Sequence, residues 1–411
     1  MRRTDLRSGT AYLLVLVTVL ITVAVGVSSV MVHRVRRERL DRIADMDRAR
    51  AVAQAGLELA VAYIQSDSQW RTNRGLGTWM DGDSVLDGTV TLVASDPDGD
   101  ANDDAADPVT LTSEAVVGSA RQAVSATFTP VPVPMTCLEY SSSSGDQTGF
   151  NGTLSSNATL ASNGSMGALL ATVNANVIAG GSITGISFNG TTSSNAGTRQ
   201  HPASSALDWY IANGTPIAFS SLPSGRISST VIGPNRNPYG STNALGIYVI
   251  DCGNSNISIR NCRIEGTLVL LNAGSSSTID QRVNWKPAKE GMPALLVQGR
   301  MRIELSSSNL SEATSTTNFN PSTAPYNGVS DNDMLDTYPS RIEGLLYATD
   351  DFVIQGITTI LGQVVASDDI TYNGTVTITR SSTYTESPPQ GFIARYNLLS
   401  DPASFARVFD E

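Results

Sequence analysis

The chain has 411 residues, a formal net charge of −11, and only two histidines and three cysteines. Charged residues make up 16% of the chain, against about 25% in an average soluble domain, and 40% of it is hydrophobic. An acidic chain lacks the basic surface of a nucleic-acid-binding protein, and this hydrophobic content excludes an extended disordered chain. The shortage of His and Cys argues against His-based catalysis and against a Cys/His metal site.

Charge is divided unevenly along the chain. Residues 1–50 hold ten arginines and five acidic residues, a net of +5, and the rest of the chain has a net of −16. The 23 residues 10–32 contain no charged side chain and are mostly aliphatic. As a helix they span about 35 Å, which is enough to cross a hydrocarbon core and too long for the apolar core of a secretory signal peptide. The sequence therefore predicts a retained membrane helix.

The helical pattern continues beyond this span. Oppositely charged side chains stand four residues apart, as in Arg34 and Glu38. We expect one long helix over residues 10–64, with a membrane-spanning half over 10–32 and an amphipathic half over 33–64. The arginines after the span favour a cytoplasmic C-terminal side, but interleaved acidic residues and the large acidic remainder favour an exterior one. Apolar residues of the amphipathic half recur at steps of three and four: Leu40, Ile43, Ala53, Leu57, Ala60, Val61 and Ile64.

The first part of the chain has a short basic leader ending at Gly9, a long apolar helix and the Ala-Gly-Leu-rich segment 53–60. With these features it resembles the N-terminal region of type IV pilin-like proteins. The closest types are PilX-like minor pilins and K-type minor pseudopilins of type II secretion. The resemblance covers about residues 1–65. It implies cleavage by a prepilin peptidase between Gly9 and Thr10, with residues 1–9 as the leader, and packing of the apolar helix against those of other pilin-like subunits. Leu14 stands where most major pilins carry Glu, which points to a minor subunit. The alternative to a pilin-like protein is an ordinary single-span membrane anchor.

Residues 65–129 are predicted to form a small antiparallel sheet, because segments 87–95 and 108–128 alternate apolar and polar residues. An acidic loop joins the two segments. A solvated hairpin loop explains its Asp, Gly and Pro content and is the favoured interpretation. Calcium binding is the alternative, since alternate acidic and amide side chains can supply oxygen ligands. The candidate ligands are Asp96, Asp98, Asp100, Asn102 and Asp104, and no other cofactor is expected.

Composition changes after a Pro-rich linker at residues 130–136. Residues 137–411 are rich in Ser, Asn, Gly and Thr, and segment 344–356 repeats eighteen residues later with Gly and Asp at matching positions. Equal-length repeats of short strands predict a β-solenoid, or parallel β-helix, with three strands and their turns in each coil. A two-sheet sandwich is the alternative. Residues 275–340 are expected to form long loops, and Asn-Gly pairs are expected to form tight turns at 151–152, 163–164, 189–190, 213–214, 327–328 and 373–374.

Two sets of residues in this region are candidates for chemistry. The acidic pairs 350–351 and 368–369 are of the type that cleaves glycosidic bonds, but a pair repeated in successive coils is typical of a structural corner. We therefore expect no enzymatic activity. Cys252 and Cys262 could form a disulfide if the domain lies outside the cytoplasm, which would leave Cys137 unpaired. His201 lies in a polar segment and is expected to be solvated.

The sequence as a whole predicts an α+β pilin-like region followed by an all-β solenoid at residues 137–411. The expected function is that of a membrane-anchored structural subunit, a minor component of a type IV pilus or a type II secretion pseudopilus, that displays an adhesive surface domain. The helix would lie in the inner membrane, with the remainder in the periplasm or outside the cell. Expected partners are the membrane, other pilin-like subunits, prepilin peptidase, and surface glycans or other cells. The rival functions are an adhesin on an ordinary membrane anchor and a polysaccharide-active β-helix enzyme.

Overall fold

The computed structural model describes residues 7–67, 69–96, 99, 107–185 and 187–408. They form two compact units, Met1–Val131 with Asn397–Glu411, and Pro132–Tyr396. The boundary falls inside the Pro-rich segment predicted as a linker, and strand β4 continues through this segment to Pro134. The last residues of the chain belong to the first unit, so the solenoid is inserted between two parts of that unit.

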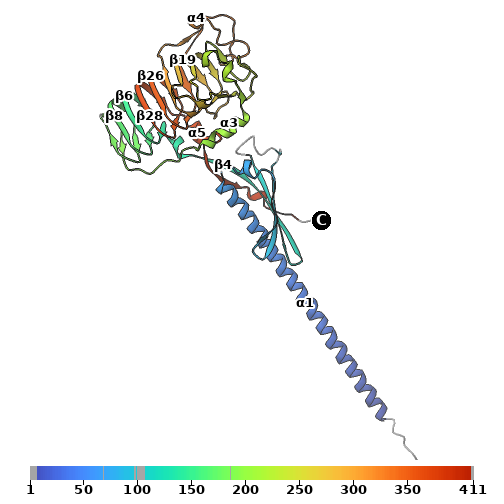
Figure 1. Ribbon diagram of the computed structural model, residues 1–411. Helices are drawn as coiled ribbons and strands as arrows, with labels where there is room; N and C mark the ends of the chain where they lie inside the picture. The colour runs from blue at the N-terminus through green and yellow to red at the C-terminus, as the bar shows by residue number, and fades with distance from the viewer. Residues whose placement is uncertain (1–6, 68, 97–98, 100–106, 186, 409–411) are drawn as a thin grey trace, which may run out of the picture. The chain divides into compact units, whose positions relative to one another are not determined.

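The first unit begins with one continuous helix, α1 (Arg7–Ser66), which confirms the predicted long helix (Figure 1). Leu40 and Ile43, which were expected on its packed face, are 65% and 56% exposed. The packed face starts later because the sheet that covers it reaches only the second half of the helix. Its buried residues follow the 3.6-residue period of a helix; they are Ala49, Val52, Ala53, Gly56, Leu57, Ala60 and Ile64.

The sheet beneath this face is the predicted small antiparallel sheet. It contains β1 (Gly77–Val85), β2 (Gly88–Ser95), β3 (Val109–Val117) and β4 (Ala120–Pro134), each paired antiparallel with the next, and a short helix α2 (Trp70–Asn73) precedes it. Two strands from the end of the chain, β29 (Ile393–Ser400) and β30 (Ala406–Val408), also pair with β4. Helix α1 packs on β2 and β3.

Gly56 allows α1 to lie close to this sheet. A Cβ atom at this position would lie 2.3 Å from Ser113 Oγ and 2.8 Å from Val90 Cγ1, well inside van der Waals contact. Glycine within a helix costs about 1 kcal/mol relative to alanine. The close approach that it permits explains why the helix has a glycine in its buried face.

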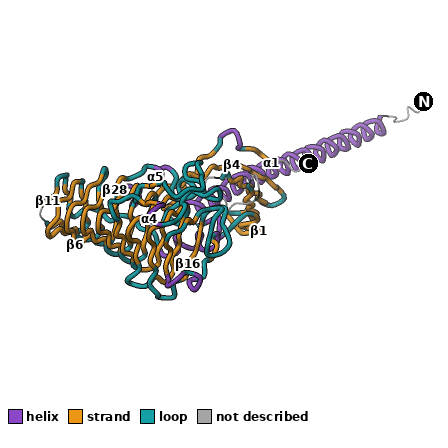
Figure 2. The backbone as a smooth tube through the Cα atoms, turned by 90° about the horizontal axis from the view of Figure 1, so that it is seen from above, coloured by secondary structure: helices purple, strands orange, loops and turns teal. Residues whose placement is uncertain are grey.

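The second unit is built from two parallel sheets and confirms the predicted β-solenoid (Figure 2). The twelve-stranded sheet contains β10 (Ile183–Thr184), β11 (Ser187–Phe188), β8 (Met166–Asn174), β6 (Gln147–Ser156), β28 (Ile370–Thr379), β26 (Phe352–Leu361), β24 (Arg341–Glu343), β21 (Met301–Leu305), β19 (Thr278–Lys286), β17 (Ser258–Glu265), β15 (Val231–Ile232) and β14 (Arg226–Ser228). The ten-stranded sheet contains β12 (Thr192–Ser193), β9 (Val177–Ala179), β7 (Leu160–Ser162), β5 (Ser142–Ser144), β27 (Val364–Ala366), β25 (Leu346–Ala348), β20 (Leu295–Gly299), β18 (Thr267–Ala273), β16 (Ile247–Asp251) and β13 (Thr215–Pro216).

The eighteen-residue repeat is one coil of this solenoid. Strands β26 and β28 pair in register over their whole length, from Phe352 with Ile370 to Leu361 with Thr379. The inward side chains of both sheets form one continuous apolar core. Because each coil contributes the same inward positions, a repeat in sequence becomes a stack in space.

The order of the coils differs from the order of the sequence. The first coil, with β5 and β6, lies in the middle of the stack, between the coils of β7–β8 and of β27–β28 (Figure 1). The chain winds outward from there to β12, crosses to β13 and β14 at the other end, and winds back until β28 pairs with β6. The last coil is therefore closed against the first one.

Glycines with positive φ form one corner of this stack. Gly356, Gly374 and Gly152 are register neighbours with φ of +72°, +128° and +107°. The pairs Asn151-Gly152 and Asn373-Gly374, which were expected to be tight turns, instead bend continuous strands at this corner. Asn327-Gly328 does form the expected tight turn, since Tyr326 and Val329 are bridged antiparallel across it.

The outer side of the solenoid is partly covered. Short helices α3 (Asp208–Asn213) and α5 (Thr383–Glu386) supply Tyr210 and Tyr384 to a second core on the outer face of the ten-stranded sheet. The expectation of loops over residues 275–340 is wrong for its first part, which forms β19, β20 and β21. Only residues 306–340 leave the stack, and they contain β22 (Leu310–Ser311), α4 (Glu312–Ser315) and β23 (Thr337–Tyr338).

Candidate functional site

The first half of α1 is the feature with the clearest functional geometry. Every residue from 11 to 43 is exposed, and an 18-residue window of this helix has a mean hydropathy of 2.6. Among the described residues, this is the one helix that is long and apolar enough to span a membrane. An aliphatic surface of this size is unstable in water, so it requires an apolar environment such as lipid.

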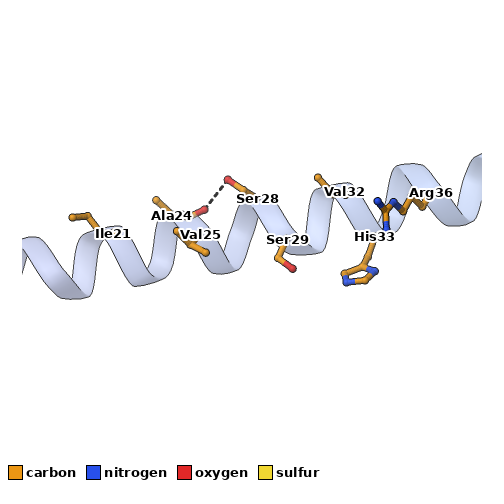
Figure 3. Close-up of a pocket in the computed structure, with 8 residues that line it drawn as sticks. All are labelled: Ile21, Ala24, Val25, Ser28, Ser29, Val32, His33 and Arg36. Carbon is orange, nitrogen blue, oxygen red and sulfur yellow. Dashed lines mark hydrogen bonds between the residues drawn. The ribbon is translucent and has the colours of Figure 1, made fainter.

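Polar side chains within this apolar half are bonded to the helix itself. Thr22 Oγ1 donates to the carbonyl oxygen of Thr18 at 2.7 Å, and Ser28 Oγ donates to that of Ala24 at 2.7 Å (Figure 3). Such bonds satisfy hydroxyl groups where no water is present. A shallow depression of about 520 Å³ runs along this flank of α1, lined by Ile21, Ala24, Val25, Ser28, Ser29, Val32, His33 and Arg36 (Figure 3).

The predicted processing site lies at the start of α1. Gly9 and Thr10 belong to the first turns of the helix, and Leu14 is 67% exposed on it. Cleavage between Gly9 and Thr10 stays a prediction.

Most of the predicted calcium loop lies outside the described residues. The candidate ligands outside them are Asp98, Asp100, Asn102 and Asp104. Asp96 follows β2, and its Oδ1 accepts a hydrogen bond from the backbone N–H of Gly99 at 3.3 Å. The bond closes a short local loop between a carboxylate and the backbone three residues later. Calcium binding at these residues stays a prediction.

Aspartates at another corner of the solenoid bond to the next coil. Asp351 Oδ1 accepts from the backbone N–H of Asp369 at 3.1 Å. Asp369 in turn accepts from the N–H and the hydroxyl of Thr148 at 3.1 and 2.8 Å, and Asp146 Oδ1 accepts from the N–H of Ser165 at 2.7 Å. These carboxylates occupy equivalent positions in successive coils and connect one coil to the next, as expected of structural corners.

Cys137, Cys252 and Cys262 are all buried free thiols, so the disulfide left open by the sequence is not formed in this structure. Cys252 follows β16 of the ten-stranded sheet, whereas Cys262 lies within β17 of the twelve-stranded sheet. Both belong to the apolar core between the sheets. Burial raises the pKa of Cys252 to about 11 and raises that of Cys262 further.

His201 is partly buried against the solenoid, contrary to the expectation of a solvated side chain. Its Nε2 lies 2.7 Å from Ser143 Oγ, and burial, with a smaller contribution from the charge of Arg199, lowers its pKa to about 4. The pair resembles the nucleophile and base of a hydrolase, but Ser143 is fully buried and no substrate can reach it. The contact therefore holds the segment around residue 201 on the solenoid. No local pattern predicts this contact, since the two residues are 58 positions apart in the chain.

A polar cleft of about 510 Å³ lies beside the twelve-stranded sheet. Arg260 pairs with Asp280 in this cleft at 2.9 Å, and Glu304 accepts a hydrogen bond from the neutral side chain of Gln355 at 2.5 Å. The sequence did not single out these residues, because they come together only through the pairing of strands from different coils.

Solved structures that are similar to this chain include a bacterial pilin and a yeast ice-binding protein. A crystal structure of the competence-associated pilin ComZ from Thermus thermophilus is similar over 89% of this chain and 98% of that one, with 12% identity and a TM-score of 0.30. A glycosylated ice-binding protein, LeIBP, from an Arctic yeast is similar over 61% of this chain and 95% of that one, with 10% identity and a TM-score of 0.29. At these scores neither likeness supports a conclusion about this chain. No family model and no curated protein matches it.

Proposed function

We propose that the chain is a pilin-like, membrane-anchored structural subunit that is built into a filament of the type IV pilus or type II secretion class and displays the solenoid outside the membrane. The observation that carries this proposal is α1. One continuous helix has an exposed apolar first half and a second half packed on an antiparallel sheet. That combination suits a subunit whose helix passes from lipid into a bundle of similar helices.

Small residues on the flank of α1 support the filament over a simple anchor. Ala24 and Ser28 lie one turn apart on the same flank (Figure 3). Small side chains at this spacing let neighbouring apolar helices approach closely, and hydroxyls bonded within the helix cost nothing there. A helix that only contacts lipid has no need of such a flank.

We propose a structural and binding role, without catalysis, for the solenoid. Asp351 and Asp369, one residue from each candidate acidic pair, accept hydrogen bonds from the backbone of neighbouring coils. A carboxylate that connects one coil to the next, at the equivalent position in each coil, is typical of a structural corner. Surface glycans or other cells are the partners that we propose for the displayed domain.

The test is the N-terminus of the protein made together with a prepilin peptidase. Mass spectrometry should find a chain that begins at Thr10, and Gly9→Val should leave Met1 in place. Gly26→Val is the matched control, because a Cβ at Gly26 meets no atom within 4 Å, and it should be cleaved like the wild type. A wild-type chain with an intact Met1 would refute the filament subunit and leave the ordinary membrane anchor.

A further inference from the structure

The lobe formed by residues 306–340 has few apolar contacts to hold it. It leaves the stack after β21, returns at β24, and contains only eight residues of regular structure in β22, α4 and β23. Its core is small and consists of Val231, Leu310, Phe319, Ala324 and Tyr338. An ordered lobe of this length, with so little buried apolar surface, needs another source of stability.

A buried carboxylate organises the lobe. Glu312 is fully buried, and it accepts hydrogen bonds from the backbone N–H of Phe319 at 2.5 Å and of Asp336 at 3.1 Å, and from the hydroxyl of Tyr338 at 3.0 Å. An ionised carboxylate has about four acceptor positions. One position therefore remains on Glu312 after these three bonds.

Further carboxylates gather at the same place. Glu312, Asp331 and Asp333 each place one carboxylate oxygen within 4.8 Å of the other two. Two oxygens on opposite sides of a Ca²⁺ ion, each about 2.4 Å from it, are about 4.8 Å apart, so a single ion can reach all three.

Positive charge that would balance these groups is scarce. Residues 306–340 contain four acidic residues and no Lys or Arg. Arg263 approaches from β17, but its guanidinium donates to the carbonyl oxygens of Ala324 and Pro325 and lies 3.7 Å from Glu265. Four carboxylates beside one already engaged cation repel one another, which favours a bound metal ion.

Asn320 gives an independent sign of a missing ligand. Its side chain is 2% exposed, and its Nδ2 lies 3.3 Å from Asp331 Oδ2 and 3.0 Å from Asp336 Oδ2. Its Oδ1 is buried and has no hydrogen-bond partner among the described residues, and the same is true of Asp331 Oδ1. A half-turn of the amide turns its oxygen toward the carboxylates, where it can share a cation with them in place of the two hydrogen bonds that Nδ2 donates in this structure. A buried acceptor without a donor, such as Asp331 Oδ1, is costly, and a cation removes that cost.

We propose that the lobe binds one Ca²⁺ ion through the carboxylates of Glu312, Asp331 and Asp333 and the amide oxygen of Asn320, with water completing the shell. Calcium accepts six to eight oxygen ligands in irregular geometry, whereas Mg²⁺ requires a near-octahedral site. The ion closes the lobe against the solenoid. The site is separate from the predicted acidic loop at residues 96–104, and it does not depend on assembly of the chain into a filament.

The test is Ca²⁺ titration of the full-length protein in detergent by calorimetry, up to about 10 mM, beyond the millimolar range of extracellular calcium modules. We expect one site in the lobe, and Asp333→Asn should weaken its affinity by about 10- to 100-fold. Asp333 is exposed, and its Oδ1 accepts from the N–H of Leu335, a bond that Asn retains, so this variant should fold. Asp96→Asn is the matched control and should bind like the wild type.

Two further measurements locate the ion. Bound Tb³⁺ should show tyrosine-sensitised luminescence, because the Tyr338 hydroxyl lies 3.0 Å from Glu312, and Ca²⁺ should displace it. Ca²⁺ should also slow hydrogen exchange in residues 306–340 of the wild type but not of Asp331→Asn. Absence of Ca²⁺ binding, binding that Asp333→Asn leaves unchanged, or a site lost in Asp96→Asn would each overturn the proposal.

Discussion

Replacing Gly374 by alanine tests whether the glycine corner fixes the distance between coils. A Cβ at Gly374 would lie 2.4 Å from the carbonyl oxygen of Gly356 and 2.8 Å from its nitrogen. Both are backbone atoms of the neighbouring coil, so no side chain can rotate away. The φ of +128° also lies where L-residues with a side chain are strained, at a cost of about 1–3 kcal/mol. Overpacking adds about 1–3 kcal/mol, so the free energy of unfolding of the solenoid should fall by about 2–6 kcal/mol.

Gly167→Ala is the matched control for this substitution. Gly167 lies in strand β8 of the same sheet, has no positive φ, and its Cβ would meet Thr184 Oγ1 at an ordinary 3.5 Å. Its effect should stay below about 1 kcal/mol. The assay is hydrogen exchange of the full-length protein in detergent, read in β26 and β28, with the packed half of α1 as the internal reference. If the two variants differ by less than about 1 kcal/mol, the glycine corner does not set the spacing of the coils.

Three further predictions concern the corner carboxylates, the partly buried histidine and the thiols. Asp369→Ala should lower the free energy of unfolding by about 1–3 kcal/mol, because it removes two hydrogen bonds from Thr148. Asp368 is exposed, so Asp368→Ala should lower it little. Equal losses of stability in urea denaturation would contradict this prediction. The unfolded chain takes up a proton at His201 below about pH 6.5, but the folded chain does so only near pH 4. Stability should therefore fall as the pH drops from 6.5 to 4, by at most about 1.4 kcal/mol per pH unit, and His201→Gln should flatten this slope in pH-dependent melting. A thiol reagent at pH 8 should label none of the three buried cysteines until the protein is unfolded, and fast labelling of native Cys252 would refute its burial.

The long helix and the solenoid were predictable because their signals are local. An uncharged aliphatic run followed by a stripe at three- and four-residue steps specifies a helix whatever else the chain does. The eighteen-residue repeat was visible only where coils have equal length, as between β26 and β28. Elsewhere the register partners are twenty residues apart in β16 and β18, and fifteen in β11 and β8. The corners differ in length from coil to coil, whereas the inward positions stay aligned. The repeat is therefore regular in the structure but not in the sequence.

The order of the coils could not be predicted from the sequence, because no sequence pattern identifies which parallel strands are neighbours. Nothing local in the chain indicates that β28 closes against β6, whose residues lie more than two hundred positions earlier. The first unit shows the same difficulty, because its sheet is completed by residues from the far end of the chain.

The corner aspartates and the lobe carboxylates show what distinguishes a scaffold residue from a candidate site. Asp351 and Asp369 recur at the repeat distance, and each bonds to the backbone of the adjacent coil, so both serve the stacking of the coils. Glu312, Asn320 and Asp331 lie in the lobe outside the stack, and Asn320 and Asp331 each have a buried oxygen atom without a donor among the described residues. The sequence did carry one sign of this site, a stretch of 35 residues with four acidic side chains and no basic one. Such an imbalance of charge is the feature that a sequence search should examine for a bound cation.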